Sequence, residues 1–130
     1  MLSVLRFVAG LCFVEHGTSK LFHVPPSAMY AHLHLASLIG VQGFIELIGG
    51  SLICLGLFTR VAAFILSGDM AVAYFMVHFQ KSAFPVLSGG DAAILYSFIF
   101  FYLFVAGGGA WSLDRLLMPR PVRLSTSARV

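Results

Sequence analysis

Three of the five acidic residues lie inside long apolar stretches, where an ionised side chain is costly. Glu15, Glu46 and Asp69 each interrupt a run of aliphatic and aromatic residues. A charge at the bilayer centre costs about 2.5–3.5 kcal/mol on insertion scales, so such residues face a protein interior and pair, or stay protonated. These acids are therefore candidates for a polar pocket that binds a polar headgroup or moves protons.

The estimated depths of the three acids favour a common layer. At 1.5 Å of helix rise per residue, Glu15 and Glu46 lie ~20 Å and ~18 Å above the inner ends of their stretches, and Asp69 lies ~12 Å above its own. We expect the carboxyl groups to converge on a shared interior. The alternative is that they only lock neighbouring helices together through hydrogen bonds.

Helical periodicity separates the polar faces. Glu46 shares one face with small and polar residues, a composition that permits close helix approach or a cavity; they are Gln42, Gly43, Gly49, Gly50 and Ile53. On the first stretch a second face, opposite Glu15, contains Arg6, Gly10, Phe13, Gly17 and Lys20. Arg6 and Lys20 either extend to the lipid headgroups or pair with an acid of a neighbouring helix.

Two histidines are added to the candidate ligand-binding residues, but their positions do not indicate a metal centre. His16 and His78 lie in apolar stretches, but Glu15 and His16 are adjacent, about 100° apart on a helix, unlike the Glu-x-x-His pairs of di-metal bundles. Cys12 and Cys54 form no C-x-x-C pair. We predict no metal site, and the sequence does not identify a catalytic residue. The predicted ligand-binding residues are Glu15, His16, Gln42, Glu46, Asp69 and His78.

Four apolar stretches must position these residues. They run over 2–22, 38–58, 61–79 and 92–107. Hydrophobic residues make up 59% of the 130 residues and charged residues 10%, against about 45–50% and about 25% in soluble domains. Backbone groups in lipid must be satisfied within each segment. The sequence predicts an all-α, integral membrane four-helix bundle.

Basic residues near the ends of these stretches and in the segments that follow them suggest a topology. Arg6, Arg60 and a basic C-terminal segment belong to one side, and Lys20 and Lys81 to the other, which predicts that both termini are cytoplasmic. We expect a transmembrane domain over 1–117 and a disordered basic tail over 118–130. No element typical of nucleic-acid binding accompanies the tail.

Several short segments together resemble the DoxX family. They are Leu5-Arg-Phe-Val-Ala-Gly10, His16-Gly-Thr-Ser-Lys-Leu-Phe22, Gly43-Phe-Ile-Glu-Leu-Ile-Gly-Gly50, Leu55-Gly-Leu-Phe-Thr-Arg60, Asp69-Met-Ala-Val-Ala-Tyr74 with His78, Gly89-Gly-Asp91, Tyr96 and Trp111-Ser-Leu-Asp114. Asp69 stands where the family more often has Glu. The resemblance implies a multi-pass protein of the bacterial inner membrane, in a family named after a subunit of an archaeal thiosulfate:quinone oxidoreductase.

These observations lead to one expected function and two alternatives. We expect a quinone-linked redox accessory subunit that binds a quinone or similar amphipathic ligand among its helices, with a partner protein or the quinone supplying the electron carrier. We also expect a homo-oligomer or a larger complex in the lipid bilayer. The alternatives are a small proton- or cation-coupled transporter or channel, and a non-catalytic membrane scaffold.

Overall fold

A computed structural model describes residues 1–32 and 34–117. That part of the chain is helical and contains no strand. The predicted tail over 118–130 lies outside the described residues. The helices are α1 (Leu2–Phe22), α2 (Leu38–Leu55), α3 (Thr59–Ala73), α4 (Pro85–Ser88), α5 (Asp91–Ala106) and α6 (Leu113–Leu117), with a 3₁₀ turn, η1 (Ala28–Tyr30), and a π-helical turn, η2 (Tyr74–His78), that continues α3.

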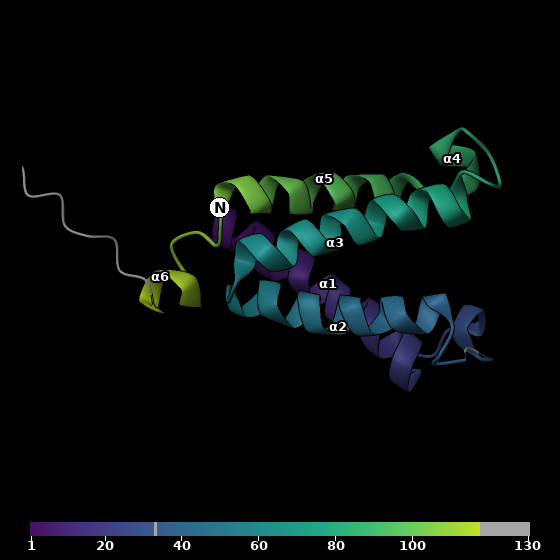
Figure 1. Cartoon of the computed structure of the whole chain (residues 1–130), viewed down its shortest axis with the longest axis horizontal. Coiled ribbons are helices and arrows are strands. Elements are labelled where there is room, and N and C mark those ends of the chain that lie inside the picture. Colours follow the sequence, from purple (N-terminus) through teal and green to yellow (C-terminus); the bar gives the residue numbers. More distant parts are fainter. Residues whose placement is uncertain (33, 118–130) are drawn as a thin grey trace, which may run out of the picture.

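Successive long helices run in opposite directions (Figure 1). Helix α1 packs mainly against α2, α3 packs mainly against α5, and α2 and α3 join the two pairs. The N-terminus, the α2–α3 turn and α6 therefore lie at one end, and the η1 and α4 loops lie at the other. The apolar stretches predicted from the sequence correspond to these four long helices.

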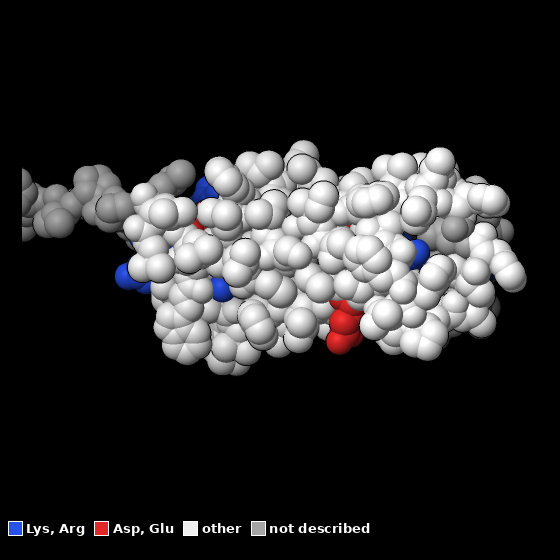
Figure 2. Space-filling view, turned by 90° about the horizontal axis from the view of Figure 1, so that it is seen from below, with Lys and Arg blue, Asp and Glu red and all other residues white. Residues whose placement is uncertain are grey.

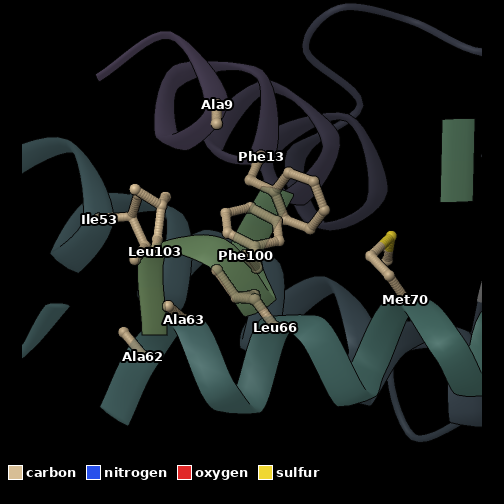
Figure 3. Close-up of a cluster of buried hydrophobic side chains, with 9 residues drawn as sticks. All are labelled: Ala9, Phe13, Ile53, Ala62, Ala63, Leu66, Met70, Phe100 and Leu103. Atoms are coloured by element: carbon tan, nitrogen blue, oxygen red, sulfur yellow. The ribbon is translucent and has the colours of Figure 1, made fainter. Parts of the chain in front are cut away.

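The core forms where the two helix pairs meet (Figure 3). Phe13 of α1 packs edge-to-face on Phe100 of α5, with ring centroids 4.6 Å apart and an interplanar angle of 87°. Apolar side chains of α2, α3 and α5 pack around this aromatic pair; they include Ile53, Leu66, Met70 and Leu103. This cluster therefore helps to hold the two helix pairs together, in addition to the contact between α2 and α3.

Large apolar side chains also cover much of the surface. On the face shown in Figure 2, basic groups lie toward the ends and one prominent acidic group lies partway along, with uncharged residues between. Two helical segments, Leu38–Leu55 and Thr59–His78, are long and apolar enough to cross a membrane. Helix α5 is shorter, with 16 residues, and α1 carries Arg6, Glu15 and Lys20.

Helix ends follow local chemistry in most places. Helix α2 ends at Gly56, whose φ of 68° suits glycine. Ser37 caps its start by accepting a hydrogen bond from the Gly40 amide. The start of α5 is the exception, because Gly90 occupies the cap position and no side chain bonds there.

Candidate functional site

Helices α1 and α2 approach closely because glycines line their contact. A Cβ added to Gly17 would lie 2.6 Å from the Leu47 amide nitrogen, and one added to Gly50 would lie 2.9 Å from that of Val14. The small, polar face predicted on α2 is thus confirmed as a packing face. The helix approach brings side chains that flank the glycines into direct contact.

One such contact is a shielded ion pair. Lys20 Nζ lies 2.7 Å from Glu46 Oε1, and the two side chains are 6% and 3% exposed. Lys20 also donates to Gln42 Oε1 at 3.1 Å. Of the two alternatives for Lys20, pairing with an acid of a neighbouring helix is therefore confirmed.

The η1 loop closes over this pair. The centroid of the Tyr30 ring lies 5.7 Å from Lys20 Nζ. Burial raises the pKa of the Tyr30 phenol, and the Glu46 carboxylate raises it further because a phenolate would add a second negative charge. Tyr30 is therefore a neutral aromatic lid that shields the ion pair from solvent.

Gln42 extends the polar contacts from α2 to α3. Its Nε2 donates to Asp69 Oδ2 at 3.5 Å, a long hydrogen bond. The second oxygen of Glu46, Oε2, is buried and has no hydrogen-bond partner within the described residues. Lys20, Glu46, Gln42 and Asp69 thus form one polar network across three helices.

The Asp69 end of this network borders a small groove. The cavity, of about 90 Å³, lies between α2 and α3 near the end that carries η1. Gln42 and Asp69 are its polar lining residues, and the remaining walls are apolar: Leu38, Ile39, Val41, Ile45, Val72, Ala73, Met76 and Val77. The cavity is smaller than the roughly 300–1,000 Å³ of pockets that enclose a whole ligand, so it suits the polar end of an amphipathic ligand whose apolar body extends beyond it.

The other predicted ligand-binding residues lie elsewhere. Glu15 and His16 are exposed on the outer side of α1. The expectation that Glu15 joins the interior acids is wrong, because α1 packs through the face of Arg6, Phe13 and Lys20. His78 lies at the end of the π-helical turn, with Nδ1 3.0 Å from the Ser88 carbonyl oxygen.

Arg6 has a structural role that the sequence did not reveal. It is 3% exposed and donates to the carbonyl oxygens of Ile53, Cys54 at 2.5 Å, Gly108 at 2.8 Å and Trp111 at 2.7 Å. The first two belong to the last turn of α2, whose carbonyls lack helical partners. Arg6 therefore caps α2 rather than reaching for headgroups.

Asp114 performs the matching task at the start of α3. Its two carboxylate oxygens accept hydrogen bonds from the backbone amides of Phe58 at 2.7 Å and Thr59 at 2.9 Å. A carboxylate there also complements the helix dipole. In the sequence, Arg6 stood out only because it shares a helix face with Gly10, Phe13, Gly17 and Lys20. Asp114 stood out only as the last residue of the DoxX-like segment Trp111-Ser-Leu-Asp114, which does not predict a helix cap.

These features define an all-helical membrane protein with a polar network inside its bundle. Residues 1–79 match the DoxX family model. The chain is 43% identical over 117 residues to an uncharacterized protein of Haemophilus influenzae, covering 87% of each chain. It is 30% identical over 141 residues to an uncharacterized membrane protein of Mycobacterium tuberculosis, covering 89% of this chain and 80% of that one. No solved structure matches it. The chain belongs to the DoxX family, as its sequence motifs predicted.

Proposed function

We propose that this DoxX protein crosses the bacterial inner membrane four times, with both termini cytoplasmic, and binds a quinone or similar amphipathic ligand in the α2–α3 groove. In this role it acts as an accessory subunit for a quinone-dependent oxidoreductase. The observation that carries the proposal is the combination of apolar groove walls with Gln42 and Asp69 at one end.

The groove chemistry suits a ring that carries carbonyl oxygens. A carbonyl needs a hydrogen-bond donor, and Gln42 Nε2 has two hydrogens while its contact to Asp69 is long, at 3.5 Å. Asp69 donates when protonated and accepts when ionised. The pair therefore can hold a polar ring oxygen in either protonation state of the acid.

The ion pair behind Gln42 fixes the position of this polar end. Lys20 holds the Gln42 carbonyl oxygen at 3.1 Å, so the amide nitrogen points toward Asp69 and the groove. A bound quinone would supply the carrier for electrons and protons. The chain's own residues would orient the ring, exclude water through the aliphatic walls, and hold a proton on Asp69.

The charge distribution supports the proposed topology. Arg60 follows the α2–α3 turn at the end of the bundle that also contains the N-terminus and α6, whereas Lys81 lies in the loop at the opposite end. A basic end facing the cytoplasm agrees with the positive-inside rule. The groove then opens toward the outer half of the bilayer.

Decylubiquinone binding to the protein in lipid nanodiscs tests the proposal. We expect saturable binding above that of empty nanodiscs, and a loss of affinity of about tenfold in Q42L and in D69L, the effect of one hydrogen bond to a charged or strongly polar group. D69N keeps a donor and should retain most of the affinity. D91N, an exposed acid outside the groove, is the matched control. Binding equal to empty nanodiscs, or unaffected by Q42L and D69L, would refute the groove.

A further inference from the structure

Glu15 and His16 remain without partners after the bundle is assembled. Helix α1 packs through its Arg6, Phe13 and Lys20 face, and Glu15 and His16 are both exposed. The His16 ring lies beside the packing face, edge-on to Phe13 with ring centroids 6.0 Å apart, and Glu15 points further away. Within residues 1–32 and 34–117, neither side chain makes a hydrogen bond or ion pair. Their surroundings on the helix include Val8 and Leu11, which are 52% and 45% exposed.

The two residues lie too deep to reach the headgroups. At 1.5 Å per residue, Glu15 lies ~20 Å from the start of α1 and ~10 Å from its end. A glutamate side chain is much shorter than that remaining distance, unlike the long basic chains that extend to the interface. In a membrane, this acid requires a partner at its own depth.

The helical positions of the two residues suggest which partner. Adjacent residues project about 100° apart around a helix. Leu5, Val8 and Cys12 lie on a line between Glu15 and His16, so the acid and the base flank an apolar seam at almost the same depth, about 50° to either side. A carboxyl group and an imidazole are complementary hydrogen-bonding partners.

We propose that this α1 face binds a second copy of the chain through a two-fold axis along the membrane normal. This axis relates equivalent residues of the two copies at the same depth in the membrane. It also places the Glu15 side of one α1 helix opposite the His16 side of the other. Glu15 of each copy then meets His16 of the partner subunit, twice over. Each pair holds one proton in total and is neutral overall, whichever atom carries it.

We infer a second copy and not a different protein because this α1 face carries both an acid, Glu15, and a base, His16, and is therefore complementary to itself. A different partner would need its own acid and base at matching depths, whereas the chain already supplies both. The inference rests on the membrane crossing of α1 given in the proposed function, but not on the proposed ligand, because the groove lies between α2 and α3 and contains none of these residues.

A cysteine placed on the seam allows a direct test in membranes. Cys12 is half-buried beside Tyr96 of α5, and Cys54 contacts the Phe7 carbonyl oxygen inside the α1–α2 contact, at 3.6 Å, so V8C in a C12S/C54S background supplies a more exposed thiol on the seam. Copper phenanthroline with oxygen removes two electrons and two protons from a pair of thiols and should link two chains of this variant. We expect the dimer band in V8C and a much weaker band in F44C, an exposed α2 position in the same background. An equal band in F44C, or no band in V8C in liposomes at several protein densities, would overturn the proposal.

A charge-complementation experiment then tests the pairing itself. E15H places two imidazoles on the face and H16E places two carboxyls there, so each variant alone should self-associate about tenfold more weakly. Co-expression of the two variants with different tags should restore association, because each now meets its complement. D91H, an exposed acid changed outside α1, should behave as wild type. Association unaffected in both variants, or unrestored on mixing, would contradict the Glu15–His16 pairing.

Discussion

Lys20 and Glu46 form an ion pair, 2.7 Å apart, that joins α1 to α2 and is almost completely shielded from solvent. Gln42 and Tyr30 complete its surroundings. Burying either charge alone would cost desolvation free energy with no compensating attraction, so the two opposite charges are stable here only as a pair. The pair therefore couples the helix packing to the polar end of the groove.

Removing one partner of this pair should destabilise the protein strongly. We expect K20M to lower the free energy of unfolding by about 3–5 kcal/mol, because Glu46 remains buried without its cation. The double variant K20M/E46M should recover most of that loss. Reversible unfolding in mixed micelles measures these values, with exposed K81M as the control. Equal stability of K20M and wild type would contradict the shielded pair.

Arg6 should not tolerate replacement by lysine. R6K keeps the positive charge but loses the planar fork that reaches four carbonyl oxygens on α2 and the α5–α6 loop. We expect a loss of about 2–3 kcal/mol, since hydrogen bonds from charged donors are among the stronger ones. Exposed R60K serves as the control. A neutral R6K would instead indicate that Arg6 reaches the headgroups.

Asp114 should stabilise the start of α3. D114A removes the acceptor for the Phe58 and Thr59 amides, and loss of a helix cap costs about 0.5–2 kcal/mol. The same change should release α6 and increase protease cleavage near residues 107–117. K81A, a change at an exposed residue of the loop at the opposite end of the bundle, should change neither. Unaltered cleavage and stability in D114A would refute this role.

Alanine in place of glycine should have opposite effects at two positions. G17A places a methyl group 2.6–2.7 Å from the Leu47 backbone, and overpacking of this kind costs about 1–3 kcal/mol. Gly68 has no neighbour within 4 Å of an added Cβ, so G68A should stabilise α3 by about 0.5–1 kcal/mol. The unfolding free energies of both variants check this. A harmless G17A would mean that α1 and α2 lie further apart.

Local sequence patterns predicted the elements and part of the site. The apolar stretch over 2–22 coincides with α1, because Pro25 and Pro26 follow the end of the stretch. The packing face of α2 around Glu46 was predicted because the helical repeat and the small size of its residues are both evident from the sequence of that one helix. Gln42 was predicted on the same grounds, and Asp69 as an acid inside an apolar stretch; both line the groove.

The remaining features depend on contacts between distant segments. Arg6 and Gly108 are 102 residues apart, and Asp114 and Phe58 are 56 apart, so no local pattern connects them. On α1 two faces carried polar residues, and only packing decided that the Lys20 face turns inward and the Glu15 face outward. The depth of a residue in the membrane could not distinguish these two faces of α1, because residues at the same depth can lie on opposite sides of a helix.

Photoaffinity labelling tests the groove most directly. An azido-quinone would be activated on the protein in nanodiscs, with the modified peptides mapped by mass spectrometry and excess decylubiquinone as competitor. We predict competed adducts on residues 38–45 of α2 and 69–77 of α3, and their loss in D69L. Labelling confined to the outer face of α1, or spread evenly over all helices and insensitive to competitor, would contradict the ligand site between α2 and α3.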